Sequence, residues 1–284
     1  MFLTREDSRV LGKSFALSEG TGKLAIGKLK NKLILGDCVA GMKRLRSGCI
    51  DLVFADPPYN KGKDFGNSSD RMKRDTYLSW TDTWIKEAKR ILKDSGSIYV
   101  CSGWEYSGDI QRIISRYFVI RNRITWKREK GRGSKTNWKN NMEDIWFATA
   151  GTSYTFNVDK VKLKKEVIAP YRVNGLPKDW VQDKGTRYRY THPSNIWTDM
   201  VVPFWSMREN TPHPTQKPEK LLERIILASS NTSNMVLDPF LGSGTTAVVA
   251  RRLKRAYIGF ELNEDYLKLA MKRLKYARSP ERGK

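Results

Sequence analysis

The stretch IDLVFADPPYN (50–60) joins a continuous apolar run to an acidic residue, two prolines and a tyrosine. A short apolar run without polar alternation is typical of a strand that is buried on both faces of a parallel sheet. Such a strand would deliver Asp56 to the carboxyl edge of the sheet, where open α/β folds bind their ligands. Pro57 and Pro58 fix φ and have no N–H donor, so their carbonyls can accept hydrogen bonds from a ligand.

We predict that this segment receives one planar group that carries an exocyclic amine. Asp56 would accept one N–H, the Pro57 carbonyl would accept a second, and Tyr59 would stack on the ring. A nucleobase amine fits this description. The alternative is a strand that ends in a proline-rich turn and binds no ligand.

Other short apolar runs alternate with helical patterns, which predicts crossover units and a largely parallel sheet. Strands are expected at 32–35, 50–55, 97–100, 122–126, 144–148, 235–238 and 256–260. Helices are expected near 76–94 with Gly96 as terminator, after Pro218, and from about Asn263 as N-cap. The predicted fold class is therefore α/β, doubly wound around a mostly parallel seven-stranded sheet.

The glycine turn in VLDPFLGSGTT (236–246) lies between an expected strand and an expected helix. Gly242 and Gly244 would let backbone amides approach a ligand at the helix N-terminus. Glu261 follows Gly242 by nineteen positions, about the offset at which a carboxylate binds ribose hydroxyls. The lysine of a P-loop and the third glycine of a dinucleotide fingerprint are both absent. The pattern favours a nucleoside-bearing ligand without a pyrophosphate, and the alternative is a tight connection only.

The charge of the chain favours a polyanionic partner. The formal net charge is +23, from 53 Lys and Arg against 30 Asp and Glu, and the pI is near 9.9. Nucleic acid is the first expectation and an acidic membrane surface the second, unless the charge only reflects a basic proteome. No window approaches a membrane span, and the N-terminal stretch lacks the apolar core of a signal peptide. Three cysteines without metal-ligand spacing and two histidines predict a cytoplasmic protein without a metal site.

The stretch from 127 to 205 breaks the alternation of strands and helices. Its first part, KREKGRGSKTNWKNN (127–141), contains six cations and one anion together with Trp138. A run of charge is often only a solvated face, but cations mixed with aromatic residues suit a surface that holds phosphates and stacks on bases. We predict DNA contacts at four residues of this part: Lys130, Arg132, Lys135 and Lys139.

Four segments together carry a family resemblance. GDC (36–38), DLVFADPPYN (51–60), HPTQKPEKLLERII (213–226) and VLDPFLGSGTTAVVA (236–250) follow one another in an order that resembles the β-class amino-methyltransferases of DNA. The resemblance spans roughly 32–277 and is weakest in the middle. DPPY in place of SPPY resembles the adenine-N6 branch more than the cytosine-N4 branch. The resemblance implies a Rossmann-like methyltransferase fold and a type II restriction-modification methyltransferase that uses S-adenosylmethionine and no metal, with S-adenosylhomocysteine as product.

The resemblance also implies an organisation of the chain. It predicts a loosely attached basic N-terminal arm over 1–31 and a flexible tail over 278–284. The catalytic domain would comprise 32–126 and 206–277, and 127–205 would form a basic, loop-rich target-recognition lobe that includes the strand near 144–148. No base-reading residue in this lobe can be nominated from the resemblance.

Site residues follow from the same resemblance. The catalytic motif would be Asp56, Pro57, Pro58 and Tyr59. Asp37 would hold the adenine amine of the cofactor, Glu261 would hold its ribose, and the glycine turn would wrap its methionine part. The full expected set of cofactor-binding residues is Asp37, Cys38, Asp56, Lys217, Asp238, Phe240, Gly242, Ser243, Gly244, Thr245, Glu261 and Leu262. No base is required of His213, and we do not expect it to be catalytic.

The expected reaction is direct in-line methyl transfer to adenine N6 in double-stranded DNA after the base flips out of the helix. No cysteine lies in the Pro-Cys pair that a covalent cytosine-C5 mechanism uses. Cytosine N4 in DNA and adenine in RNA remain as alternative targets. An alternative of another class is a non-catalytic basic DNA-binding protein with a degenerate methyltransferase fold. Relatives of this kind often pair, which favours a homodimer, and the sequence leaves open whether a cognate restriction endonuclease exists.

Overall fold

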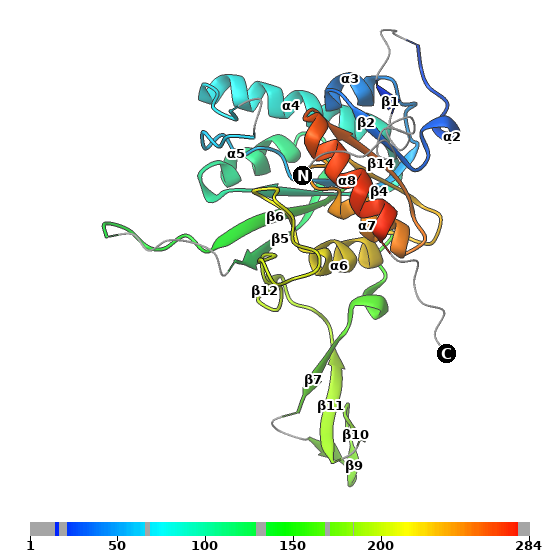
Figure 1. The fold of residues 1–284 in the computed structure, drawn as a ribbon. Coiled ribbons are helices and arrows are strands. Elements are labelled where there is room, and N and C mark those ends of the chain that lie inside the picture. The colour runs from blue at the N-terminus through cyan, green and yellow to red at the C-terminus, as the bar shows by residue number, and fades with distance from the viewer. Residues whose placement is uncertain are drawn as a thin grey trace.

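A nine-stranded sheet forms the centre of the molecule, in the order β1-β2-β14-β13-β3-β4-β6-β5-β12 (Figure 1). The computed structural model describes residues 15–16, 22–65, 69–128, 135–167, 171–183 and 185–277. The strands of the sheet are β1 (Phe15–Ala16), β2 (Lys32–Leu35), β3 (Ile50–Ala55), β4 (Leu92–Ser102), β5 (Val119–Lys127), β6 (Met142–Thr149), β12 (Ile196–Trp197), β13 (Met235–Asp238) and β14 (Ala256–Glu261). All seven predicted strands are present, and the two-residue strands β1 and β12 extend the sheet at its edges.

The sheet is mostly parallel, as predicted. Only β6 runs antiparallel to its neighbours β4 and β5, and every other adjacent pair of strands described in the central sheet is parallel. The strand β3 lies between β13 and β4, and its residues Leu52, Val53 and Ala55 are fully buried. The continuous apolar run before Asp56 is therefore explained by burial on both faces.

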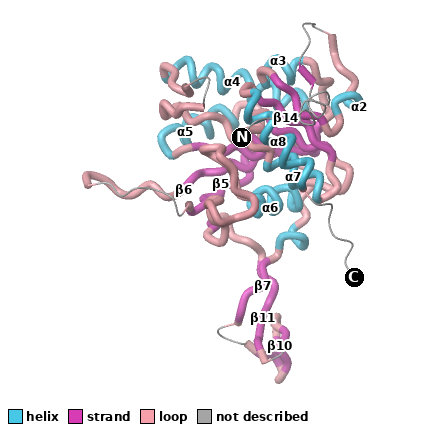
Figure 2. The backbone as a smooth tube through the Cα atoms, viewed as in Figure 1, coloured by secondary structure: helices cyan, strands magenta, loops and turns pink. Residues whose placement is uncertain are grey.

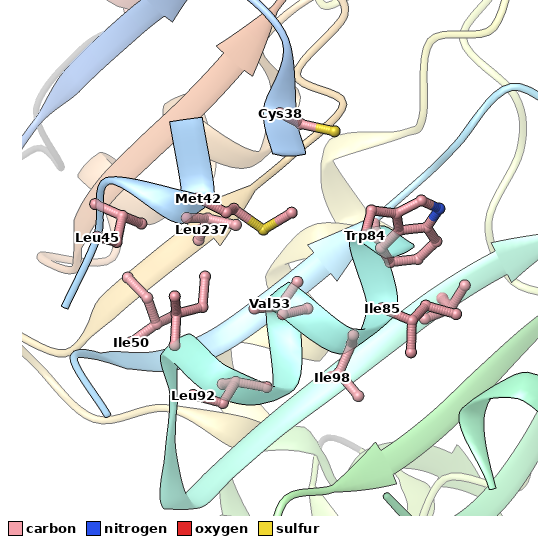
Figure 3. Close-up of a cluster of buried hydrophobic side chains, with 14 of the residues drawn as sticks. Cys38, Met42, Leu45, Ile50, Val53, Trp84, Ile85, Leu92, Ile98 and Leu237 are labelled. Atoms are coloured by element: carbon pink, nitrogen blue, oxygen red, sulfur yellow. The ribbon is translucent and has the colours of Figure 1, made fainter. Parts of the chain in front are cut away.

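Helices cover both faces of the sheet (Figure 2). The helices are α2 (Ile26–Leu29), α3 (Cys38–Lys43), α4 (Arg74–Ile91), α5 (Trp104–Ile114), α6 (Glu219–Ser229), α7 (Thr245–Arg252) and α8 (Glu264–Tyr276), with a short 3-10 helix at Val158–Val161. One apolar cluster packs α3, α4 and α5 against the sheet, and Figure 3 shows Met42, Val53, Ile85 and Leu237 among its members. A second cluster packs α6, α7 and α8 against the opposite face. This arrangement is the predicted doubly wound class.

The local signals at the helix ends differ in their outcome. Asn263 caps α8, and its side chain accepts hydrogen bonds from the amides of Asp265 and Tyr266, as predicted. The prediction that Gly96 terminates α4 is wrong, because the helix ends at Ile91 and β4 begins at once. Gly96 lies in β4 near a shift of register with β3, where a Cβ would approach the Leu92 side chain to 2.7 Å. The glycine therefore serves close packing within the sheet.

The described part of the N-terminal segment is attached to the core. Leu29 of α2 is 1% exposed and belongs to the first apolar cluster, and the Leu24 amide donates to the Arg44 carbonyl. The prediction of a loose arm is therefore wrong for residues 22–31. The predicted tail at 278–284 lies outside the described residues. None of the helices in the described part of the chain is both long and apolar enough to cross a membrane.

Two projections leave the sheet between residues 127 and 205 (Figure 1). The first is the connection from β5 to β6, of which residues 135–141 are described. The second, which we call the tongue (162–191), contains a three-stranded sheet and a separate hairpin. Its strands are β7 (Leu163–Glu166), β8 (Arg172–Val173), β9 (Leu176–Pro177), β10 (Val181–Asp183) and β11 (Thr186–Thr191). The tongue extends well beyond the two helical layers (Figure 2).

Candidate active site

A cavity of about 640 Å³ opens at the carboxyl ends of β2, β3, β13 and β14. Residues directly after these strands line it, because parallel strands deliver their ends to one edge of the sheet. The segment Asp56–Tyr59 and Gly242 both lie in its wall. The two motifs that the sequence identified separately therefore share one cavity.

Asp56 is engaged by two side chains inside this cavity. Its Oδ1 accepts a hydrogen bond of 2.7 Å from the Tyr59 hydroxyl, and its Oδ2 accepts one of 2.6 Å from the Lys217 ammonium. The Lys217 Nζ also lies 3.3 Å from Oε2 of Glu143, whose Oε1 accepts from the Arg128 guanidinium. We call these residues the charged cluster: Asp56, Tyr59, Arg128, Glu143 and Lys217.

The charged cluster contains two carboxylates and two cations, and their mutual pairing sets their titration. Burial alone would lower the pKa of Lys217, but the adjacent carboxylates of Asp56 and Glu143 raise it above its usual value. Burial opposes the charge of Glu143, but Lys217 and Arg128 hold its pKa below the usual range. Burial raises the pKa of Asp56, against the opposing effect of Lys217 and with a further increase from Glu143. Asp56 is therefore the more easily protonated of the two carboxylates.

The two prolines after Asp56 have different surroundings. The Pro58 carbonyl accepts a hydrogen bond of 2.9 Å from the Tyr77 hydroxyl of α4, so it serves the fold. The Pro57 carbonyl accepts no hydrogen bond from any described residue, and Pro57 lines the cavity. Asn60 then turns the chain at a φ of +57° and accepts from the Met72 amide at 2.6 Å. Of the two proline carbonyls, only that of Pro57 is left for a ligand.

The glycine turn is held by the carboxylate that the spacing identified. The Gly242 amide donates to Glu261 Oε2 at 2.7 Å, and Glu261 Oε1 accepts from the Asn263 amide at 2.9 Å. Gly242 has a φ of +51°, and a Cβ there would lie 2.9 Å from Nε2 of His213. A larger residue at 242 would therefore be strained and would collide with the cavity wall. Burial raises the pKa of Glu261.

The remaining wall of the cavity combines an acid with apolar surface. Asp37 caps α3 by accepting from the Ala40 amide at 2.8 Å, and Asp37 and Cys38 both line the cavity. Phe240 packs edge-on against Trp84 with ring centroids 5.3 Å apart. Leu262 lies at the rim and is 71% exposed.

Four of the predicted cofactor-binding residues do not line the cavity: Asp238, Ser243, Gly244 and Thr245. Asp238 accepts from the Phe240 amide at 2.9 Å and from the Thr246 hydroxyl at 2.5 Å, and burial raises its pKa to about 7. The Thr245 hydroxyl donates to the Lys217 carbonyl at 3.2 Å. These side chains support the glycine turn from behind, so we assign them to positioning the turn and not to ligand contact.

Glu143 and Arg128 were not identified from the sequence. Glu143 lies at the start of β6, and β6 is antiparallel to its neighbour β4, so its first residues reach the carboxyl edge of the parallel strands. The only signal was an acid before an expected strand whose direction was not predicted. His213 also lines the cavity, where burial and the nearby Lys217 and Lys63 lower its pKa to about 4. It is neutral at pH 7, in line with the expectation that it is not catalytic.

The predicted DNA contacts fall on the connection between β5 and β6. Lys135 and Lys139 are exposed there, and Asn140 and Met142 of the same segment line the cavity. Trp138 is 92% exposed between these residues. Lys130 and Arg132 lie outside the described residues. No cluster of metal-ligating side chains occurs in the described part of the chain.

Comparisons with known proteins agree on one family. The family profile described as DNA methylase matches residues 50–272. The chain is 36% identical over 252 residues to the type II methyltransferase M.HpaI of Haemophilus parainfluenzae, covering 87% of this chain and 74% of that protein. It is also 36% identical over 258 residues to the DNA adenine methyltransferase YhdJ of Escherichia coli (strain K12), covering 88% of this chain and 85% of that protein.

Solved structures show the same fold at lower identity. A putative DNA modification methylase of Thermus thermophilus, solved with S-adenosyl-L-methionine, has a TM-score of 0.61 at 22% identity, covering 88% of this chain and 94% of that one. The PvuII DNA methyltransferase, titled cytosine-N4-specific, has a TM-score of 0.64 at 20% identity and covers 85% of each chain. With the cavity geometry and the matched residues 50–272, these findings place the chain in the DNA methylase family.

Proposed function

We propose that the protein is a site-specific DNA methyltransferase that transfers a methyl group from S-adenosylmethionine to N6 of adenine in double-stranded DNA. The observation that carries this proposal is the single cavity shared by Asp56, Pro57 and the glycine turn. The relative YhdJ, named a DNA adenine methyltransferase, supports adenine as the target. Intact Asp56, Tyr59, Gly242 and Glu261 argue against the non-catalytic alternative.

The residues present fit S-adenosylmethionine. The acids at the ends of β2 and β14, Asp37 and Glu261, suit the amine of its adenine and the hydroxyls of its ribose. Gly242 keeps the wall open where any Cβ would collide with His213, and Phe240 adds an apolar surface. When bound, S-adenosylmethionine supplies a methyl group that its positively charged sulfur activates for nucleophilic attack.

The chain's own contribution is to hold and activate the amine. The lone pair of an aromatic amine is delocalised into the ring, so the amine is a weak nucleophile. Acceptors at Asp56 and the Pro57 carbonyl favour the more tetrahedral nitrogen and stabilise the positive charge that develops on it. Because the site is buried, these interactions are stronger than they would be in water. The target amine lies inside the duplex stack, so the base must flip out before it can reach this edge of the sheet.

The experiment that tests this proposal identifies the modified nucleoside. DNA, and separately RNA, is incubated with the protein and S-adenosylmethionine carrying a labelled methyl group, then digested to nucleosides for mass spectrometry. We expect labelled N6-methyldeoxyadenosine from DNA. Labelled N4-methyldeoxycytidine would support the target suggested by the neighbour titled cytosine-N4-specific. Label in RNA alone would contradict the DNA assignment, and an absence of label would contradict the enzyme assignment.

Two basic elements support contact with the DNA backbone. Lys135 and Lys139 are exposed on the connection that leads into the cavity wall. The tongue presents seven Lys and Arg among its described residues, against three Asp and Glu. These cations are Lys162, Lys164, Lys165, Arg172, Lys178, Arg187 and Arg189. We propose that both elements anchor phosphates on either side of the flipped base and that the tongue belongs to the target-recognition lobe.

Reversing the charge of Lys135 and Lys139 together should weaken DNA binding. Two lost phosphate contacts should lower the slope of log K against log salt by about 2 and reduce affinity at least about 10-fold at low salt. Fluorescence anisotropy with a labelled duplex over a salt series measures both quantities. The matched control reverses Lys28 and Lys86, two exposed lysines on α2 and α4. Equal losses in both double variants would mean that only net charge matters.

Tyr59 should separate base stacking from its hydrogen bond to Asp56. Tyr59→Ala removes the ring, whose stacking on a base contributes about 1–3 kcal/mol, so flipping should weaken by about 10- to 100-fold. Tyr59→Phe removes only the 2.7 Å bond to Asp56 and should flip the base nearly normally. The fluorescence increase of 2-aminopurine at the target position reports flipping. An unchanged signal in Tyr59→Ala would exclude the stacking role.

Three further features remain proposals. We propose a homodimer on the family resemblance, and a cognate restriction endonuclease because similar proteins are named type II methyltransferases. We propose the cytoplasm as the compartment, which is supported by three free cysteines at 38, 49 and 101.

A further inference from the structure

The Lys217–Asp56 pair raises a conflict for the proposed reaction. The Lys217 ammonium lies 2.6 Å from Asp56 Oδ2 and is only 7% exposed. An ammonium at this distance competes with the target amine for the carboxylate. It would also repel the positive charge that develops on the amine nitrogen during methyl transfer. A site that relied on Asp56 and Lys217 alone would therefore present a largely neutralised carboxylate.

Glu143 is placed to resolve this conflict. Its Oε2 lies 3.3 Å from the Lys217 Nζ and accepts from the Tyr59 hydroxyl at 3.3 Å, so it contacts both groups that bind Asp56. Its side chain is 4% exposed, and its other oxygen is bound by Arg128. A second buried carboxylate beside an ion pair is costly unless it is itself compensated, and Arg128 provides that compensation.

We propose that Glu143 is a positioning residue for methyl transfer: it holds the Lys217 ammonium away from full engagement with Asp56, so that the Asp56 carboxylate keeps its charge for the target amine. This inference rests on the proposed function and assigns a role to a residue that acts through Lys217. It also gives the buried lysine a purpose, because Lys217 keeps two neighbouring carboxylates ionised at once.

The surroundings of Asp56 define what each substitution should do. The titratable groups that face it come from several elements: Tyr59, Lys63, Cys101, Glu143, Lys217 and Asp238. Removing the negative charge of Glu143 leaves Asp56 with the cations as its nearest charged neighbours, which favours its ionised form and lowers its pKa. Removing the positive charge of Lys217 leaves Asp56 beside a like charge in a buried site, which raises its pKa further. The two substitutions therefore shift the pH profile in opposite directions.

Glu143→Gln should lower the single-turnover rate of methyl transfer by about 10- to 100-fold, because the ammonium then neutralises the acceptor of the developing charge. The rate is measured on a premixed complex of protein, S-adenosylmethionine and duplex from pH 6 to pH 9.5. The acid limb of the Glu143→Gln profile should lie below that of the wild type, since Asp56 ionises more easily. The acid limb of Lys217→Met should lie above the wild type, with a rate that rises as pH increases. A merely structural role would not move these limbs in opposite directions.

The double variant Glu143→Gln with Lys217→Met makes the test sharper. Without the ammonium, the loss of Glu143 no longer neutralises Asp56, so at pH 9.5 the double variant should be faster than Glu143→Gln alone. The control Glu223→Gln changes a partly exposed glutamate of α6 that pairs with Arg252 and should keep the wild-type rate. Thermal unfolding and cofactor affinity, measured for each variant, identify any that fold incorrectly.

Three outcomes overturn the inference. A Glu143→Gln variant with the wild-type rate and pH profile removes its basis. A double variant that is slower than Glu143→Gln at every pH, by the full factor of Lys217→Met, shows that the two residues act independently. A wild-type protein that transfers no methyl group to DNA overturns the proposed function and this inference together, whereas an active wild type with an equally active Glu143→Gln overturns the inference alone.

Discussion

Asp56→Asn is expected to reduce the rate of methyl transfer at least about 1000-fold, since removal of one preorganised charged group at the reacting atom commonly costs about 100- to 1000-fold. The amide keeps the size of the carboxylate but loses its charge, and its NH2 group would present a donor to the donating amine. It would also face the Lys217 ammonium, which lies 2.6 Å from Oδ2 in the wild type. Both effects act at the position where the amine must bind.

Cofactor affinity should change much less in this variant. Asp37, Phe240, Gly242 and Glu261 line the other part of the cavity wall and are untouched by the substitution. Single-turnover methylation gives the rate, and titration calorimetry with S-adenosylmethionine gives the affinity, which we expect within about threefold of the wild type. The control Asp75→Asn alters an exposed acid in the first turn of α4. Turnover near the wild-type level in Asp56→Asn would refute the role of this carboxylate.

Glu261→Ala should have the largest effect on cofactor binding. Its two oxygens hold the amides of Gly242 and Asn263, at 2.7 and 2.9 Å, so truncation loosens the glycine turn and removes the acceptor for the ribose hydroxyls. A hydrogen bond to a charged group contributes about 1.5–3 kcal/mol, which predicts an affinity loss of about 10- to 100-fold for the ribose contact alone. The loosened turn should bring the total to about 100-fold or more.

Glu261→Gln separates these two contributions. The amide oxygen can still accept from one backbone amide, so the turn should be better preserved and the affinity loss smaller than in Glu261→Ala. Calorimetry with S-adenosylmethionine measures the affinity of both variants, with Glu264→Gln on the exposed side of α8 as control. If Glu261→Ala binds the cofactor as tightly as the control, Glu261 is only a structural acid and the cofactor lies elsewhere.

The sequence was most informative where short-range patterns decide the structure. The apolar runs identified every one of the seven long strands of the central sheet, because burial on both faces of a parallel sheet requires continuous apolar segments. The spacing between Gly242 and Glu261 predicted a direct relation, and the structure shows a hydrogen bond of 2.7 Å between them. Parallel strands deliver their ends to a common edge, which explains why separate motifs could be assigned to one cavity.

The sequence was least informative where long-range pairing decides the structure. Lys217 lies 161 positions after Asp56, and no local pattern reveals that its ammonium binds that carboxylate. Glu143 reaches the cavity only because β6 runs against its neighbours, a direction that the strand pattern does not encode. Gly96 illustrates the opposite error, since a glycine after a helical pattern resembles a terminator but here permits close packing inside β4.

The most direct measurement is the position of the target amine in a crystal structure with a duplex and a non-reactive analogue of the cofactor. The account predicts that the adenine lies outside the helix, with N6 within hydrogen-bonding distance of Asp56 and the Pro57 carbonyl and with the analogue against Gly242 and Glu261. An adenine that stays stacked in a correctly bound duplex, or an amine that points away from Asp56, would contradict it.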